Sequence, residues 1–212
     1  MQTVSECTIR QPQTQILSAA FNLNTPLIDD TLQPADEHNS AFDIARRSIE
    51  LVKLGGFNKI TWDSAGNSVP SFCIFELLSH RALVELTHLA HSRGLETYVS
   101  GGVSARTVVH GVNAGVGGIG IGTSLHSIDE SGRIGSLLKD PIANVIRERN
   151  RASRTDVGKL ASLLAHADRD YADGVVNPLI EWREALFAVL ARQNPADASS
   201  LLSEIQKSLV RT

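Results

Sequence analysis

Short apolar runs alternate with longer amphipathic stretches over the first 150 residues of the chain. Each apolar run is closed by Gly, Ser, Asn or Asp, as is typical of buried strands. The predicted strands are Gln15–Asn22, Asn58–Asp63, Leu95–Ser100 and Gly118–Gly122. Strands that alternate with helices indicate a parallel sheet with right-handed crossovers, and nearly continuous apolar strands predict that both faces of this sheet are covered.

Apolar residues recur at helical spacing between these strands, and most helical stretches begin at a capping residue or end at a glycine. The predicted helices lie between Asn39 or Ser40 and Gly55, between Ser79 and Gly94, between Ser104 and Val112, and over Ile134–Ile146. Pro141 lies inside the last of these and argues for a break there, because proline lacks the amide that a helix interior needs.

Beyond residue 150 the pattern changes to helices alone. These are predicted over Asp156–Arg169, Pro178–Arg192 and Ala196–Val210. We therefore divide the chain into a polar segment at residues 1–14, a unit of strand–helix repeats at 15–150 and a helical extension at 151–212. The apolar stripes of the extension predict that it packs on the sheet or on a second subunit.

About four strand–helix units fit into residues 15–150, which is half of the eight that close a TIM barrel. The predicted fold class is therefore α/β: a parallel (βα) half-barrel of TIM type with a C-terminal all-helical extension. Unclosed sheet edges carry unpaired backbone groups, which favour association with another chain. We expect a homodimer, or a hetero-oligomer in which a second protein supplies the missing strands.

The composition is that of an ordinary globular protein: 212 residues, 42% hydrophobic and 20% charged, with a formal net charge of -3. This charge offers no general attraction to nucleic acid or to an acidic membrane surface, so neither is expected as a partner. Cys7 and Cys73 are too few for a disulfide framework, which favours a reducing compartment. The N-terminal residues have no apolar signal segment and no window is long enough to span a membrane, so we expect a cytoplasmic protein.

Two glycine-rich turns follow the third and fourth predicted strands, and together they predict a phosphate site. Glycine lets the backbone approach an anion closely, and free amides at a helix start carry partial positive charge. In parallel barrels the loops after the last two strands often bind phosphate. The predicted phosphate-binding residues are Ser100, Gly101, Gly102, Gly120, Gly122, Thr123 and Ser124, with Arg133 as a charged contact. The structural alternative is a pair of tight turns without a ligand.

No metal ion or cofactor is expected. His88 and His91 stand three residues apart on a predicted helix, but no third ligand is evident and the pattern places them near a solvent face. Asp63 ends a strand, where barrel enzymes carry catalytic groups, although it can equally be a cap or turn residue. No lysine has the setting of a desolvated nucleophile, and Lys59 stands at the start of its strand.

The order of short stretches around the segment from Asp63 to Arg133 is characteristic; they are Thr61–Ala65, Ser79–Leu83, Ala90–Leu95, Ser100–Val103, Ile119–Ile121 and Gly132–Ile134. In this order they resemble the family of (5-formylfuran-3-yl)methyl phosphate synthases, which open the biosynthesis of the furan in methanofuran-type cofactors. Together with the strand that ends at Phe21, the resemblance covers residues 15 to 140 and corresponds to the second half of that barrel.

The resemblance implies an aldolase-like lyase that condenses triose phosphates, with lysines and an aspartate in its active site. The aspartate corresponds to Asp63, and the lysine that follows it in the family corresponds to Asn67, so these two are the candidate catalytic residues. Two functions stay open: an enzyme whose lysines come from a partner chain, and a subunit that binds a phosphorylated ligand without catalysis. A third alternative is a barrel similar to the nicotinate phosphoribosyltransferases, which the glycine turns also resemble.

Overall fold

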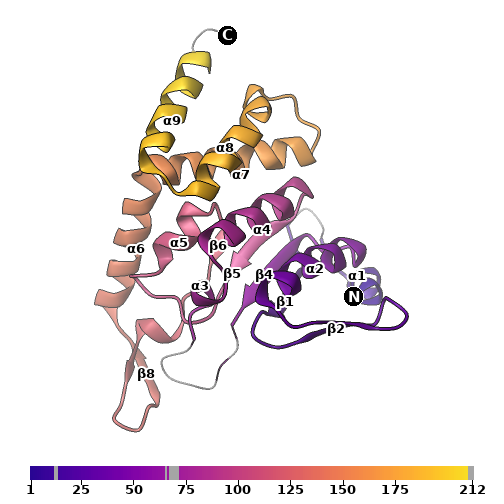
Figure 1. The fold of residues 1–212 in the computed structure, drawn as a ribbon. Coiled ribbons are helices and arrows are strands. Elements are labelled where there is room, and N and C mark those ends of the chain that lie inside the picture. The colour runs from indigo at the N-terminus through magenta and orange to yellow at the C-terminus, as the bar shows by residue number, and fades with distance from the viewer. Residues whose placement is uncertain (12–13, 65, 67–71, 210–212) are drawn as a thin grey trace.

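The computed structural model describes residues 1–11, 14–64, 66 and 72–209 and shows a mixed α/β fold (Figure 1). Within this part of the chain one parallel sheet has the order β1 (Ser18–Asn22), β4 (Lys59–Asp63), β5 (Glu96–Val99) and β6 (Gly118–Ile119). The register places Thr61 beside Tyr98, and Tyr98 beside Gly118. The four predicted strands and their parallel pairing are therefore confirmed.

Two amphipathic helices, α2 (Ala41–Leu54) and α4 (His80–Ser92), cover one face of the sheet. Each begins after its predicted capping serine, whose hydroxyl accepts the amide three residues on, as Ser40 does from Asp43 at 3.1 Å. Trp62 is fully buried between sheet and helices, and its Nε1 donates to Ser48 Oγ of α2 at 3.0 Å. The strand residues buried on this face are Ile60, Trp62, Thr97 and Val99.

The other face of the sheet is open within the described residues, so the prediction that both faces are covered is wrong. Ser18 and Ala20 are exposed, while Lys59, Thr61 and Tyr98 are half-buried. Polar groups on this face contact one another: Ser18 Oγ lies 3.0 Å from Thr61 Oγ1, and Lys59 Nζ lies 4.3 Å from the centroid of the Tyr98 ring. The reason is that polar and apolar residues alternate in β4, and the exposed positions of β1 hold the small residues Ser18 and Ala20, so that only one face requires burial.

Two N-terminal segments for which no helix or strand was predicted contain short elements. The helix α1 (Gln2–Cys7) lies close to the end of α2, where a Cβ on Gly55 would lie 2.8 Å from the Cβ of Met1. The strands β2 (Leu27–Asp29) and β3 (Asp36–His38) form an antiparallel hairpin between β1 and α2. Asp29 is buried and pairs with Arg47, which attaches this hairpin to α2.

The segment from Ile134 is a strand, not the start of a helix as predicted. After the short 3₁₀ helix η1 (Thr123–Leu125), β7 (His126–Ile128) pairs antiparallel with β8 (Ile134–Leu137), and β8 is exposed along its length. The helix α6 (Lys139–Arg154) begins only afterwards. Pro141 therefore lies in the first helical turn, where a missing amide removes no hydrogen bond and no break follows.

Two short helices complete the crossovers around β5. The helix α3 (Ile74–Leu77) precedes α4, and α5 (Val108–Asn113) connects β5 to β6. The predicted helix after Ser104 starts later than expected, because the Ser104 carbonyl first accepts the amides of Thr107 and Val108 in a turn.

The C-terminal region is helical, as predicted, and comprises α7 (Asp156–Ala172), the 3₁₀ helix η2 (Pro178–Trp182), α8 (Arg183–Arg192) and α9 (Pro195–Leu209). Helices α7 and α8 pack on α4 (Figure 1). Asp168 of α7 is fully buried, and its carboxylate lies 2.8 Å from His88 Nδ1 of α4 and accepts from Arg183 Nε at 2.7 Å. This buried charge network attaches the helical region to the sheet unit.

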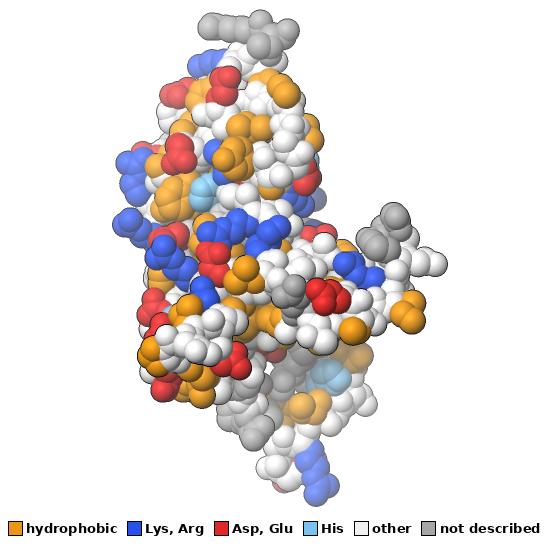
Figure 2. Space-filling model, turned by 90° about the vertical axis from the view of Figure 1, so that its right-hand side faces the viewer, with side chains coloured by type: hydrophobic (Ala, Val, Ile, Leu, Met, Phe, Trp, Pro, Cys, Tyr) orange, Lys and Arg blue, Asp and Glu red, His pale blue; other side chains and the backbone are white. Residues whose placement is uncertain are grey.

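One hydrophobic core extends through the sheet unit and the helical region, joining Trp62 and Leu86 to Leu160, Leu190 and Ile205. The boundary predicted at residue 150 falls inside α6. On the surface, Figure 2 shows charged side chains of both signs with hydrophobic side chains scattered among them. Among the described helices, none is long and apolar enough to cross a membrane.

Candidate functional site

The two glycine turns line one cavity at the carboxyl ends of β4, β5 and β6. Its volume is about 630 Å³, within the range of small-molecule sites. The described residues that line it are Asp63, Ser64, Gly66, Tyr98, Ser100–Val103, Gly120–Ser124 and Ile128. The fold thus brings together Asp63 and all the predicted phosphate-binding residues except Arg133.

Gly101 holds the first turn against the end of β4. Its φ is +100°, a conformation that favours glycine, and a Cβ there would lie 2.0 Å from Ser64 Oγ and 2.8 Å from Asp63 Oδ1. The Gly101 carbonyl accepts the amide of Ile74, and Ser64 Oγ donates to the Phe72 carbonyl at 2.6 Å. Contacts within the protein therefore fix this turn without a ligand.

The backbone amides of Gly101, Gly102 and Gly122, in the two turns, have no acceptor within the described part of the chain, and all three residues line the cavity. By contrast, the Gly120 amide donates to the Val99 carbonyl at 2.7 Å and extends the sheet. Unpaired amides that border one cavity favour an anion, because they supply both hydrogen-bond donors and oriented dipoles.

The hydroxyl groups of the cavity differ in what they can offer a ligand. Ser124 Oγ donates to the Val103 carbonyl at 2.7 Å, so its proton is used to link the second turn to the first. The Ser100 and Tyr98 hydroxyls make no hydrogen bond to any described residue, and both residues line the cavity. We therefore regard Ser100 and Tyr98 as the better side-chain donors and Ser124 as a residue that positions the turns.

Tyr98 is a lining residue that the sequence pattern did not single out. Its ring lies over β6: a Cβ on Gly118 would lie 2.4 Å from Tyr98 Cδ2, and one on Gly120 would lie 3.0 Å from the Tyr98 hydroxyl oxygen. Glycine at both positions therefore makes room for the ring. The alternation of side chains along a strand could have identified Tyr98, because it stands two residues before Ser100 and therefore lies on the same face of the sheet.

Asp63 is the charged residue among the described lining residues. Its Oδ1 accepts the Ser64 amide at 2.8 Å, which holds the carboxylate at the end of β4. No lysine, arginine or histidine belongs to the described lining. Lys59 does not line the cavity, but its ammonium group lies over the ring of Tyr98, which does. An anion here would be held chiefly by amides and hydroxyls, and Asp63 could exchange a proton with it.

Two other predicted site residues are not among the described residues that line the cavity. Arg133 lies in the exposed turn of the β7–β8 hairpin, where its amide donates to Asp129 Oδ1 at 2.9 Å, and it is not among the residues that line the cavity. Asn67 lies outside the described residues. Asp63 is therefore the catalytic candidate that the structure places in the cavity.

His91 is buried, with 2% of its surface exposed, so the prediction that it lies near a solvent face is wrong. Helices α7 and α8 cover this side of α4, which helical periodicity within α4 could not reveal. His91 Nε2 lies 2.9 Å from Thr97 Oγ1, and burial lowers the His91 pKa to about 4. Among the described residues, no group of three or more His, Cys, Asp or Glu side chains could hold a metal ion.

Comparisons of the chain with protein-family models, with curated proteins and with solved structures found no match. The chemistry of the site therefore has to be inferred from its own geometry.

Proposed function

We propose that this chain binds a small phosphorylated substrate at the carboxyl end of its sheet, as an aldolase-like lyase related to the (5-formylfuran-3-yl)methyl phosphate synthases. The observation that supports the proposal is that the unpaired amides of Gly101, Gly102 and Gly122 border one cavity with Asp63. Parallel β/α proteins commonly bind phosphate with such amides and carry catalytic groups at this end of the sheet.

In this proposal each group has a distinct role. The three amides and the Ser100 hydroxyl bind the phosphate oxygens, which requires no cation in the lining. Asp63 moves a proton at the carbon or oxygen next to the reacting carbonyl, because its carboxylate is held in the same cavity by the Ser64 amide. A Schiff-base lysine is not among the described lining residues, so this group is proposed to come from a second chain.

The open face of the sheet supports this second chain. In a closed barrel the inner faces of the strands meet, whereas here Ser18 and Ala20 are exposed and Lys59, Thr61 and Tyr98 are half-buried. We propose that the four described strands are a half-barrel of TIM type and that a second copy, or another protein, completes it over this face.

The second candidate is a subunit that binds a phosphorylated ligand without catalysing a reaction. It is supported by the same cavity, in which amides and hydroxyls are present but lysine is not among the described lining residues. The two candidates share the ligand class and differ in turnover, so they can be separated by experiment.

Binding is tested by calorimetric titration with inorganic phosphate and with glyceraldehyde 3-phosphate. Gly122 is the position to alter, because nothing lies within 4 Å of a Cβ built there. A large side chain at this position can therefore occupy the cavity without pushing neighbouring residues aside. Gly122→Trp is expected to weaken binding of both ligands at least tenfold, whereas Gly122→Ala, the matched control, should change it by less than threefold. Equal binding by all three proteins would contradict the phosphate site.

Catalysis is tested by following consumption of glyceraldehyde 3-phosphate. For the lyase, Asp63→Asn should lower turnover by about 10²-fold or more while phosphate binding persists, because only the proton-transfer group is removed. Phosphate binding without any turnover, in the purified chain and in its isolated complex, would favour the non-catalytic subunit.

A further inference from the structure

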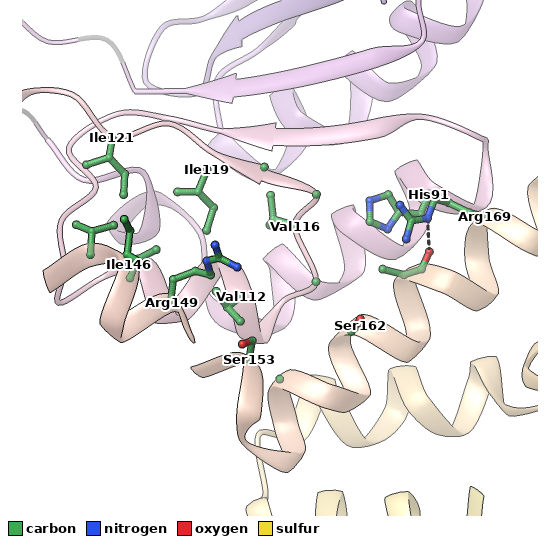
Figure 3. A pocket seen from close by; sticks show the side chains of 17 residues that line it. His91, Val112, Val116, Ile119, Ile121, Ile146, Arg149, Ser153, Ser162 and Arg169 are labelled. Atoms are coloured by element: carbon green, nitrogen blue, oxygen red, sulfur yellow. Dashed lines mark hydrogen bonds between the residues drawn. The ribbon is translucent and has the colours of Figure 1, made fainter. Parts of the chain in front are cut away.

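A second cavity, of about 620 Å³, lies between the α5–β6 segment and the helices α6 and α7 (Figure 3). It is distinct from the cavity at the glycine turns, since the two linings share only Ile121 among the described residues. Neither the sequence pattern nor the proposed function accounts for it. Its size is within the range of sites that bind small organic molecules.

One part of this cavity is apolar. Side chains from α5, β6 and α6 form it, and those labelled in Figure 3 lie on both sides of the space. They are Val108, Val112, Val116, Ile119, Ile121, Val145 and Ile146. Ile146 is 49% exposed, although it is a large apolar side chain on the wall of a cavity. Such a wall favours an apolar group as ligand, because binding would remove that surface from water.

Arg149 gives the cavity a positive charge. Figure 3 shows its side chain extending from α6 toward Val112 and Val116, and within the described part of the chain it makes no ion pair or hydrogen bond. No aspartate or glutamate is among the described lining residues, although the chain carries a net charge of -3. An arginine without an acidic partner beside apolar surface favours an anion.

Further polar groups line the end toward α7. Ser162 makes no hydrogen bond to a described residue, and Arg169 Nε donates a hydrogen bond to the Ala165 carbonyl at 3.1 Å. His91 also lines this end, and its Nδ1 is buried without a hydrogen-bond partner in the described residues. The cavity thus joins an apolar wall to a row of polar groups, as a ligand with two chemically different ends requires.

We propose that this cavity binds a carboxylate with an aliphatic tail, its head group on Arg149 and its tail between Val112, Val116 and Ile146. The Arg149 guanidinium, which has no partner among the described residues, fits one carboxylate in a bidentate pair, and the apolar wall disfavours a small inorganic anion as the ligand. This site goes beyond the proposed function and does not depend on it.

The proposal is tested by calorimetric titration of the full chain with octanoate and with 1-octanol, its uncharged analogue. Octanoate should bind, and octanol at least tenfold more weakly. Arg149→Gln should weaken octanoate about tenfold, because a charge-assisted pair is lost, and should not affect octanol. The matched control is Arg154→Gln, on the same helix but outside the lining, which should bind octanoate like the parent chain.

Ile146→Trp provides a second test, because this exposed position can take a larger side chain that fills the cavity without altering the core. It should abolish octanoate binding while thermal unfolding stays unchanged, and inorganic phosphate should not compete with octanoate. Absence of octanoate binding at millimolar concentration, equal binding by Arg149→Gln and the parent, or displacement by phosphate would each overturn the proposal.

Discussion

Gly101 and Gly122 line the same cavity for different physical reasons. Gly101 is required by the protein itself, since its backbone is left-handed and its Cα approaches Ser64 and Asp63. Gly122 has open space around it, so no contact with a described residue excludes a side chain there. A side chain added at Gly122 would therefore change the rim of the cavity more than the packing of the turn.

This difference predicts that alanine at the two positions has unequal effects on the free energy of unfolding. Gly101→Ala should lower the free energy of unfolding by about 2 kcal/mol, because the new Cβ would lie 2.7 Å from the Ser64 amide nitrogen at a φ of +100°. Gly122→Ala should change it by less than about 0.5 kcal/mol. Urea denaturation of both variants measures this, and a destabilised Gly122→Ala would contradict the open space seen at that turn.

Burial of His91 predicts a pH dependence of stability. The native pKa of about 4 lies below the usual histidine pKa of about 6.5, chiefly because the ring is buried, with a smaller opposing effect of Asp168. The unfolded chain therefore binds a proton more tightly than the native one, and stability must fall as the pH decreases from about 6.5 to about 4. This group alone accounts for a loss of about 3 kcal/mol across that range.

The measurement is urea denaturation at several pH values between 7 and 4, with His91→Gln as the comparison. The variant retains a group that can bond to Thr97 but cannot titrate, so its stability should depend less on pH in this range. The half-buried His80, whose pKa is also lowered by burial, adds a smaller slope of the same sign to both proteins. Identical slopes would show that His91 is not the group responsible.

At the scale of elements, the approach of α6 to α7 is set by a glycine inside a helix. Gly158 lies in the first turn of α7, where Thr155 Oγ1 accepts its amide at 3.1 Å. A Cβ at this position would lie 2.2 Å from the Ala152 carbonyl oxygen of α6. The two helices can therefore follow each other so closely only because this side chain is absent.

Gly158→Ala tests this contact. Alanine is intrinsically more favourable in a helix by about 1 kcal/mol, but the clash with α6 should reverse the sign and destabilise the protein by about 1–3 kcal/mol. Ser162→Ala, at an exposed position of α7, is the control and should be neutral or slightly stabilising. A gain in stability for Gly158→Ala would contradict the close approach of the two helices.

The buried carboxylate of Asp168 is the other determinant at this scale. Asp168→Ala would leave Arg183, whose side chain is 12% exposed, without its anion and should cost about 3–5 kcal/mol of stability. Asp173→Ala at the exposed end of α7 should cost less than about 0.5 kcal/mol. Chemical denaturation measures the free energy of unfolding of both variants. Equal losses would show that the buried network contributes little to stability.

At the scale of the whole molecule, the open face of the sheet makes the assembly the central question. If a second chain covers this face, light scattering after size exclusion should show a mass above that of one chain for the purified protein or its isolated complex. Ala20→Arg, on the exposed face of β1, should return it to a monomer. Ala196→Arg, at an exposed position of α9, should leave the assembly intact, and a stable monomeric parent without a bound partner would contradict the proposed half-barrel.

Local patterns were sufficient for the parallel sheet, for the serine caps of α2 and α4 and for the meeting of the two glycine turns. Each of these depends on a few neighbouring residues or on the rule that parallel strands end at one edge. The remaining features depend on which segments pack together. The Tyr98 ring lies over β6, about 20 residues further along the chain, and His91 is buried under the much more distant α7. The pairing of β8 with β7 is local, but the pattern of β8 also fits a helix, which is what it predicted.

The core shared by the sheet and the helical region has a practical consequence for dissecting this protein. Leu160 and Leu190 belong to the same buried cluster as Trp62, so removing residues 155–212 would uncover the apolar side of α4 and leave His88 without Asp168. Neither the sheet unit nor the helical region is expected to fold stably without the other, and shortened versions of the chain should aggregate. Functional roles are therefore better apportioned by point substitution in the intact chain.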